Sequence, residues 1–458
     1  MPTVRAPVPA SNGHVSFWWD QLGGGAITRS HLDGSTSTDV CIVGGGYTGL
    51  WTAYYLKQIQ PSLSVTVVER EFIGYGASGR NGGWLTAALP GSRSVLARSG
   101  GEAGVLALEQ ELRDQVDEVI AVCAREGIDA DIVKGGELSV ATSRPQLARL
   151  RSHLEPPAQE LSAAQVASRI AVDGALGGSL TPHCARIQPA KLVVGLARVV
   201  EAAGVQLLEG TPATSLEPGS VGTTFGTISA GTVLRGTEGF TAALPGQRRT
   251  WLPMNSSMIA TDPLPQSFWD AVGWSGYEVL GDEANAYIYA QRTADDRIAI
   301  GGRGVPYRYG SRTDVDGQTP QRTVDELYGA LVRLFPAAEG IGIAHAWSGV
   351  LGVPRDWSAT LSFDPVSRLG FAGGYVGHGV TSSSLAGRTL AELALGVSTR
   401  RTSLPWVNRP VRKWEPEPLR WLGVHGMYAA YRFADRRESA TGRASKVAAV
   451  ADVISRRP

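Results

Sequence analysis

The segment Thr38-Asp-Val-Cys-Ile-Val-Gly-Gly-Gly-Tyr-Thr-Gly-Leu-Trp-Thr-Ala-Tyr-Tyr-Leu56 decides the fold class. Residues 40–43 form a short apolar run of β-prone side chains bounded by glycine, which predicts a buried parallel strand. Gly44, Gly46 and Gly49 follow in the G-x-G-x-x-G spacing, and the Ala/Leu/Tyr-containing residues after them can form a helix. A strand, this glycine spacing and a helix in that order are typical of a dinucleotide-binding βαβ unit.

Each of these three positions requires glycine for a separate structural reason in such a unit. Gly44 permits the tight turn out of the strand, Gly46 lets a pyrophosphate approach the backbone, and Gly49 lets the helix pack closely on the strand. The free N–H groups and the positive dipole end of the helix favour phosphate binding. We therefore also assign Tyr47 and Thr48, at the start of the predicted helix, to the cofactor site.

A second predicted strand supports the same interpretation. Residues 64–68 are β-prone and end at Glu69, twenty residues after Gly49. An acidic residue at that place can accept hydrogen bonds from an adenosine ribose. We assign Glu69 and the adjacent Arg70 to cofactor binding. An ordinary glycine-rich turn would not be expected to combine this strand, spacing, helix and terminal acid.

Composition excludes several classes of function. The 458 residues are enough for two or three domains, and a net charge of +1 gives no electrostatic reason to expect binding to nucleic acid or an anionic membrane. No apolar run has the length of a transmembrane helix or the form of a signal peptide. Three distant cysteines, Cys41, Cys123 and Cys184, indicate a reducing compartment, and we expect a cytoplasmic protein. Neither the cysteines nor the seven histidines have metal-ligand spacing, so no metal site is predicted, and the oligomeric state is not indicated.

The remaining chain alternates between helical and strand-rich regions. The predicted helical regions are a broken helix over 94–126, residues 145–170, a helix over 188–204 and a helix over 383–395. The predicted strand regions are two strands around a Gly-Gly turn over 131–142 and an antiparallel region over 247–343, which contains a hairpin of 286–292 and 297–301. The strand-rich residues 183–245 therefore resume the first sheet after a helical insertion.

Four further segments carry a family resemblance. They are Gly76-Ala-Ser-Gly-Arg-Asn-Gly-Gly83, the helix start Gln188-Pro-Ala-Lys-Leu192, the hairpin from Tyr289 to Gly302, and Gly373-Gly-Tyr-Val-Gly-His-Gly-Val-Thr381. Together with the glycine fingerprint, they resemble the D-amino-acid oxidase superfamily of flavoenzymes, which includes sarcosine and glycine oxidases and gamma-glutamylputrescine oxidoreductase-like members. The resemblance covers roughly residues 15 to 400 in the same order, and is more specific than the fingerprint alone.

The resemblance implies an α/β plus α+β fold, with a Rossmann-like FAD-binding domain and a discontinuous substrate domain built on an antiparallel sheet. The expected parts are residues 38–93, 183–246 and 345–402 for FAD binding, residues 94–182 and 247–344 for the substrate domain, and residues 403–458 for a C-terminal helical extension.

The resemblance also implies which residues contact FAD. In the loop after the second strand, glycine N–H groups reach the flavin or a phosphate and Arg80 neutralises phosphate charge, although a mobile loop with a solvated arginine is the alternative. Near residue 382 a helix N-terminus aimed at the flavin would stabilise the charge of the reduced form, and His378 could add a donor or be merely structural. The additional expected FAD contacts are Ser78, Gly79, Arg80, Asn81, Gly82, Gly83, Ala213, Gly349, Gly377, His378, Gly379, Val380 and Thr381.

We expect FAD to be bound noncovalently. Some relatives attach FAD through a cysteine in the C-terminal third or through a histidine soon after the second strand. No cysteine follows Cys184 and no histidine lies between Glu69 and Glu126, so both routes are closed.

The implied reaction is oxidation of a primary or secondary amine, or an amino acid, to an imine by hydride transfer to flavin N5, followed by hydrolysis of the imine. The expected catalytic residues are His378, Arg292, Tyr289 and Trp347. Arg292 would pair with a substrate carboxylate, with a strand-end ion pair as the alternative. Tyr289 and Trp347 would line the substrate pocket, although large aromatic residues are usually core.

The sequence leaves more than one electron acceptor open. We expect an oxidase that passes electrons to O₂ and forms H₂O₂. However, no lysine lies between residues 192 and 412, and Thr381 stands where sarcosine oxidase-like members carry a lysine that activates oxygen. A dehydrogenase with another acceptor, a non-catalytic subunit of a hetero-oligomer, and an NAD-dependent dehydrogenase are therefore kept as alternatives.

Overall fold

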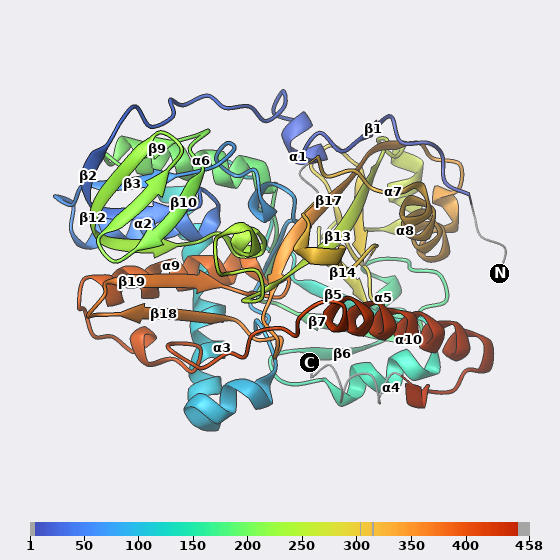
Figure 1. The fold of residues 1–458 in the computed structure, drawn as a ribbon. Helices are drawn as coiled ribbons and strands as arrows, with labels where there is room; N and C mark the ends of the chain where they lie inside the picture. The colour runs from blue at the N-terminus through green and yellow to red at the C-terminus, as the bar shows by residue number, and fades with distance from the viewer. Residues whose placement is uncertain (1–4, 303, 314–315, 448–458) are drawn as a thin grey trace.

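The computed structural model describes residues 5–302, 304–313 and 316–447, and within them two large sheets lie side by side (Figure 1). The eight-stranded sheet lies on the left of Figure 1 and the nine-stranded sheet on the right. A two-stranded ribbon of β4 (Trp84–Thr86) and β8 (Cys184–Arg186) accompanies them.

The eight-stranded sheet is built around the predicted βαβ unit. β2 (Thr36–Val43) pairs in parallel with β3 (Val65–Val68) and with β12 (Gly226–Arg235), and β3 pairs in parallel with β9 (Gln206–Leu208). The remaining strands are β10 (Ala213–Glu217), β11 (Ser220–Thr223), β18 (Thr360–Asp364) and β19 (Leu369–Gly373). The last four residues of β2 and all of β3 are buried, as expected for parallel strands covered on both faces.

Three helices pack at this sheet. α2 (Tyr47–Ile59) contacts both α6 (Pro189–Ala202) and α9 (Gly379–Ala394). α9 begins three to five residues earlier than the sequence predicts, because Gly379 and Val380 already have helical geometry. The result is a Rossmann-like fold, which confirms the first part of the predicted fold class.

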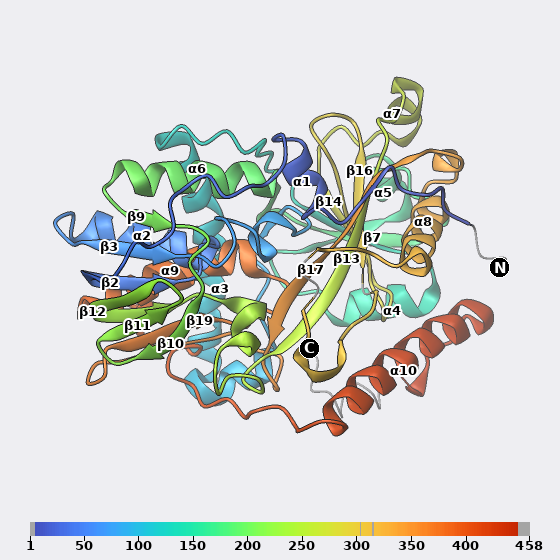
Figure 2. The same cartoon turned by 45° about the horizontal axis from the view of Figure 1, so that its top comes forward.

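The nine-stranded sheet has the order β1-β17-β13-β16-β15-β14-β5-β7-β6 within the described residues. Its strands are β1 (Ser11–Asn12), β17 (Ile343–Val353), β13 (Leu252–Thr261), β16 (Ile298–Gly302), β15 (Tyr289–Arg292), β14 (Val279–Asp282), β5 (Glu137–Ala141), β7 (Gly177–Thr181) and β6 (Gln159–Ser162). Most pairs are antiparallel, including the predicted hairpin of β15 and β16. α8 (Gln321–Leu334) covers the face away from the first sheet, as Figure 2 shows.

The structure moves one expected domain boundary. Residues 345–353 were assigned to the FAD-binding domain, but they belong to β17, which pairs with β13 along most of its length. An apolar strand can enter either sheet, and only its pairing partner decides which. Residues 345–353 therefore belong to the nine-stranded sheet.

The helical expectations were only partly correct. α3 (Arg93–Arg125) is interrupted at Gly101, whose φ of +66° is non-helical, as the glycine cluster predicts. Residues 145–170 contain only α4 (Arg144–Ser152) and α5 (Ala163–Ala167), with β6 between them. Residues 131–142 hold β5 and an isolated bridge at Val133 rather than two strands.

The C-terminal extension contains α10 (Leu419–Thr441), which lies along the nine-stranded sheet side of the molecule (Figure 2). Short elements complete the description: α1 (Phe17–Asp20), α7 (Gln266–Val272), and the 3₁₀ turns η1 (Ala77–Gly79), η2 (Glu238–Ala243), η3 (Tyr309–Ser311), η4 (Pro336–Ala338) and η5 (Arg401–Ser403). Among the helices of the described residues, none combines the length and apolar character that a bilayer crossing requires.

Candidate active site

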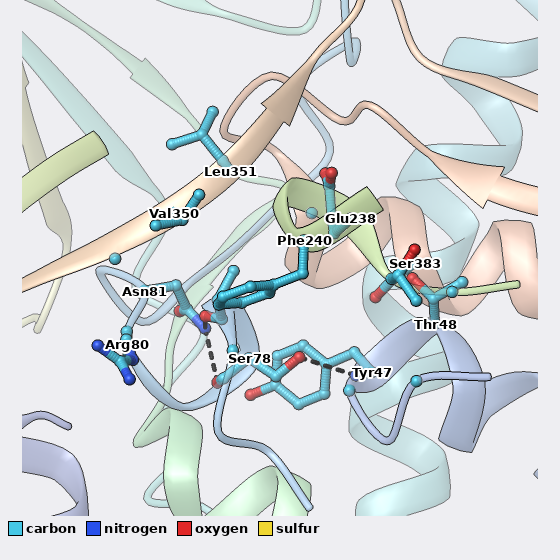
Figure 3. Close-up of a pocket in the computed structure, with 18 of the residues that line it drawn as sticks. Tyr47, Thr48, Ser78, Arg80, Asn81, Glu238, Phe240, Val350, Leu351 and Ser383 are labelled. Carbon is cyan, nitrogen blue, oxygen red and sulfur yellow. Dashed lines mark hydrogen bonds between the residues drawn. The ribbon is translucent and has the colours of Figure 1, made fainter. Parts of the chain in front are cut away.

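A cavity of about 360 Å³ lies between the two sheets and takes its walls from both. Figure 3 shows Ser78, Asn81 and Phe240 converging on it, with Tyr47 and Thr48 at the start of α2. Of the residues expected at the site, the lining includes Gly44, Gly46, Tyr47, Thr48, Glu69, Arg70, Ser78, Arg80, Asn81, Gly82, Ala213, Tyr289, Gly349, Gly377, His378, Gly379 and Val380. Gly49, Gly79, Gly83, Thr381, Arg292 and Trp347 lie outside the lining.

The turn from β2 into α2 has the geometry of a phosphate cradle. Gly44 has a φ of +111°, which only glycine adopts readily, and Gly46 is the N-cap of α2. A Cβ on Gly46 would lie 2.9 Å from the Ser78 Oγ, and a Cβ on Gly49 would lie 2.0 Å from the Gly44 carbonyl oxygen. Gly49 therefore serves helix–strand packing, while Gly46 lets the Ser78 hydroxyl approach the start of α2, where it accepts the Tyr47 N–H at 2.8 Å.

Glu69 lies at the end of β3, beside this turn. Its carboxylate accepts the N–H of Gly45 at 2.8 Å and the N–H of Glu71 at 3.0 Å. Burial raises the pKa of the Glu69 carboxyl, and the two backbone donors oppose that shift. A carboxylate held by backbone donors at the end of the second strand can accept hydrogen bonds from a ribose.

Arg80 is part of a packed wall and is not solvated. Its side chain is 4% exposed, its Nε donates to the Tyr75 carbonyl at 2.9 Å, and its Nη1 donates to the Ser348 carbonyl at 3.1 Å. The guanidinium also stacks 4.5 Å from the centre of the Tyr75 ring. This placement contradicts the alternative of a mobile loop with a solvated arginine.

The N-terminus of α9 opens onto the same cavity. His378 is the N-cap residue, its backbone N–H donates to the Tyr375 carbonyl at 2.9 Å, and its side chain is partly exposed. Gly379, Val380 and Ser383 from the first turns also line the cavity. The positive end of the helix dipole is therefore available to a negatively charged group in the cavity.

The nine-stranded sheet, which we call the substrate sheet after the expected substrate domain, places Tyr289 of β15 on the opposite wall of the cavity. The Tyr289 hydroxyl and the Ser256 Oγ are 2.8 Å apart, and the Trp84 ring meets the Tyr289 ring edge-on at 6.3 Å. A Cβ on Gly82 would lie 2.7 Å from the Tyr289 ring, so this tyrosine touches the loop of residues 76–83, which we call the glycine-rich loop. Sequence reasoning missed Ser256, which could be found only from the pairing of β13 with β16 and β17.

The structure does not bring Arg292 to the cavity. Side chains alternate along β15, so Tyr289 and Gln291 face the cavity side while Arg292 faces the other side of the sheet. Its guanidinium donates to the Trp274 carbonyl at 2.8 Å and to Asp296 at 2.6 Å, and stacks 4.0 Å from the Trp269 ring. We therefore drop Arg292 as a carboxylate-binding residue.

Trp347 is a core residue, in line with the alternative stated for it. It is fully buried on β17, packs against Phe17 and Trp18, and donates its Nε1–H to the Arg80 carbonyl at 2.9 Å. It contacts the glycine-rich loop from behind and does not reach the cavity.

Glu238 is a cavity residue that sequence reasoning missed. Its carboxylate accepts the N–H of Tyr375 at 3.1 Å and the N–H of Gly352 at 2.9 Å. Burial raises the pKa of Glu238 to about 7, against the opposing effect of these donors and Arg235. Its position follows from the sheet order: β12 is a parallel neighbour of β2, so its carboxyl end reaches the same edge of the sheet.

The fold and cavity define a protein with a dinucleotide-binding βαβ unit and a cavity lined from both large sheets. Residues 39–393 match the DAO family model, described as FAD dependent oxidoreductase. The chain belongs to this family, and FAD is its cofactor.

Similar proteins support this assignment. The chain is 30% identical over 405 residues to the Gamma-glutamylputrescine oxidoreductase of Escherichia coli, covering 84% of this chain and 90% of the relative. It is 31% identical to the Probable oxidoreductase OrdL of Rhizobium meliloti, covering 83% and 88% of the two chains. The solved glycine oxidase of Geobacillus kaustophilus shares the fold, with a TM-score of 0.67 at 22% identity, over 79% of this chain and 96% of that one.

The residues present fit FAD. Gly44 and Gly46 line the cavity where α2 begins, and Glu69 lines it from the end of the neighbouring strand β3. The two groups can hold the pyrophosphate and the adenosine ribose of the cofactor. The cavity then continues past Arg80 and Gly82 to the Tyr289 wall.

Proposed function

We propose that this FAD-dependent oxidoreductase oxidises a primary or secondary amine, or an amino acid, to an imine. The observation that carries the proposal is the Tyr289–Ser256 pair of the substrate sheet, which meets the glycine-rich loop at Gly82 across one continuous cavity. The names of several relatives and structural neighbours also refer to amines or amino acids, including glycine oxidase and gamma-glutamylputrescine oxidoreductase.

The proposed reaction balances with few protein groups. The substrate carbon loses a hydride, its nitrogen loses a proton to solvent, and the resulting imine takes up water to give a carbonyl compound and an amine or ammonia. FAD, when bound, supplies the two-electron acceptor. The chain itself orients the substrate and limits the access of water.

Two features of the chain would serve this chemistry. The Tyr289 and Ser256 hydroxyls form a polar pair in an aromatic wall, which can position an amine nitrogen by hydrogen bonding. The N-terminus of α9, with His378 at its cap, can stabilise negative charge that develops on the cofactor. Both roles are proposals that rest on placement in the cavity.

We propose noncovalent attachment of FAD. The three cysteines are buried in the body of the protein and lie outside the cavity lining. Denaturation in acid followed by filtration tests this directly, because the flavin absorbance should pass through the filter. Flavin retained with the precipitated protein would contradict it.

The electron acceptor is proposed to be O₂, with another acceptor as the second candidate. The lysines that activate oxygen in sarcosine oxidase-like proteins have no counterpart between residues 192 and 412. Mixing the reduced protein with air-saturated buffer in a stopped-flow instrument separates the two: reoxidation within seconds with H₂O₂ formed supports an oxidase, and slow reoxidation that a quinone or dye accelerates supports a dehydrogenase. The cytoplasmic location stays a prediction from the sparse cysteines.

The function is tested by anaerobic addition of amines, polyamine conjugates and N-methyl amino acids to the purified yellow protein. At least one of them should bleach the flavin absorbance. A second candidate function, a subunit that binds FAD without catalysis, is favoured by relatives named Sarcosine oxidase subunit beta. That candidate predicts stable flavin binding with no bleaching unless a partner subunit is added.

A further inference from the structure

Three consecutive carbonyl groups of the glycine-rich loop accept side-chain hydrogen bonds from outside the cavity. The Gly79 carbonyl accepts the Ser16 Oγ–H at 2.6 Å. The Arg80 carbonyl accepts the Trp347 Nε1–H at 2.9 Å, and the Asn81 carbonyl accepts the Trp18 Nε1–H at 2.8 Å. We call Ser16, Trp18 and Trp347 the donor set.

The donor set is deeply buried. Ser16, Trp18 and Trp347 are at most 1% exposed. A donor that is buried at this depth and loses its acceptor costs more than a surface donor, because water cannot replace the bond. The three bonds therefore favour one orientation of the loop peptides over others.

The N-terminal segment that carries two of these donors is anchored to both domains. β1 pairs with β17, and the Gln188 side chain donates to the Trp18 carbonyl at 2.9 Å. Farther along, the backbone N–H groups of Thr28 and Arg29 donate to Glu209. Figure 1 shows this dark blue segment crossing from the nine-stranded sheet through α1 to β2.

Peptide geometry links these carbonyls to the cavity. In a trans peptide the C=O of one residue and the N–H of the next point in opposite directions. The carbonyls of Arg80 and Asn81 bond to tryptophans behind the loop, so the N–H groups of Asn81 and Gly82 are directed away from those tryptophans. Asn81 and Gly82 themselves line the cavity.

We propose that the donor set positions the Asn81 and Gly82 N–H groups for the flavin, Trp347 and Trp18 through the peptides that carry these groups and Ser16 through the peptide before them, and so sets both the affinity for FAD and its reduction potential. Ser16, Trp18 and Trp347 are positioning residues, because they act through the loop and do not reach the cofactor. The proposal depends on FAD as the cofactor and is independent of which substrate is oxidised. An N–H group that points at the flavin stabilises the negative charge of the reduced form.

The sharpest test is Trp18→Phe, with Trp19→Phe as the matched control. Trp18→Phe keeps an aromatic ring against Phe17 and Trp347 but removes the N–H that the Asn81 carbonyl accepts. Trp19 is its neighbour on α1, is also buried, and its Nε1 has no hydrogen-bond partner in the described part of the chain. Its indole packs against Gly79 of the same loop, so the control changes the packing on the loop but breaks no hydrogen bond to it. The control therefore removes an indole N–H without freeing a loop carbonyl.

We expect Trp18→Phe to bind FAD about tenfold more weakly, as the loss of one buried hydrogen bond predicts. If reduced flavin loses a further tenfold relative to oxidised flavin, the midpoint potential falls by about 30 mV. Fluorescence titration of the apoprotein and a dye-equilibration titration measure these values, and the shape of the visible flavin absorbance should change with them. Trp19→Phe should match the unaltered protein in all three.

Two results would overturn the proposal. One is a Trp18→Phe protein with a lowered melting temperature but unchanged FAD affinity, potential and spectrum, which would make the segment a structural anchor only. The other is an equal shift in Trp19→Phe. If Trp18→Phe does not fold, Trp347→Phe replaces it, because that change frees the Arg80 carbonyl and should shift the same three quantities. Unchanged FAD affinity, potential and spectrum in Trp347→Phe would likewise contradict the proposal.

Discussion

The two walls of the cavity are built on different principles. The FAD side is made largely of backbone groups: the turn at Gly44 and Gly46, the loop from Gly76, and the first turn of α9. The substrate side is made of side chains, Tyr289 and Ser256 among them, that alternate along β-strands. A backbone site needs glycine at fixed spacing and is visible in the sequence, whereas a side-chain site depends on which face of a strand is turned toward the cavity.

The largest effect is expected on the backbone-built wall. Gly49→Ala places a Cβ 2.0 Å from the Gly44 carbonyl oxygen, where neither backbone can yield easily. We expect a loss of about 3 kcal/mol in the free energy of unfolding and loss of FAD binding, measured by urea denaturation and by flavin content after purification. The control is Gly329→Ala in α8, where nothing lies within 4 Å of the added Cβ, and which should be neutral or stabilising. A fully folded, flavin-loaded Gly49→Ala protein would contradict the account.

A second prediction concerns Glu238, between the two walls. Its folded-state pKa of about 7 lies above its ordinary value of 4.5, so the folded apoprotein holds this proton more tightly than the unfolded chain. Below pH 4.5 the carboxyl is protonated in both states, and its full contribution to the free energy of unfolding is present. That contribution falls by about 3 kcal/mol as the pH rises from 4.5 toward 7.

Glu238→Gln should remove this part of the pH dependence. Urea denaturation of the apoprotein at a series of pH values from 5 to 8 measures it, and Glu217→Gln, an exposed substitution on β10, serves as the control. If the unaltered protein and Glu238→Gln lost stability equally over this interval, Glu238 would not be the group responsible.

A third prediction tests the side-chain wall. Tyr289→Phe removes the hydroxyl that bonds Ser256 but leaves the ring against Gly82 and Trp84. We expect kcat/KM for the amine to fall about tenfold, the equivalent of one hydrogen bond, with FAD content unchanged. Steady-state kinetics on flavin-matched samples measure it. Full activity would show that the substrate does not use this polar pair.

The smallest effect on activity is expected at Arg292. Its guanidinium stacks on Trp269 and bonds Asp296 on the far side of the sheet from the cavity. Arg292→Gln should lower the melting temperature by a few degrees while KM changes alike for amines with and without a carboxylate. A selective rise in KM for the carboxylate-bearing amine would restore Arg292 to the substrate site.

The same contrast explains how far the sequence could be interpreted. The βαβ unit, FAD and the cavity position of His378 followed from glycine spacing and segment order. Alternation along a strand places Tyr289 and Arg292, three residues apart, on opposite faces, so the sequence could exclude one of them from the cavity. Which face is turned toward the cavity did not follow, because it depends on the pairing of β15 with β14 and β16. The sheet that takes up β17, and with it the core position of Trp347, depends on pairing with β13, which is a long-range property.

Glu238 was missed for a related reason. It follows β12 by three residues, and its importance arises only when β12 is placed beside β2 and η2 is packed against β17. The donor set is likewise assembled from residues more than 300 positions apart. Such contacts have no local signature that spacing or periodicity could supply.

The most direct test of the central claim is a single anaerobic turnover. The protein is loaded with one FAD per chain, mixed with an excess of the best amine without oxygen, and followed by its flavin absorbance and by the carbonyl product. The account predicts bleaching of the flavin with one carbonyl formed per FAD. A flavin that remains oxidised with every amine and amino acid offered, in a protein that binds FAD fully, would contradict it.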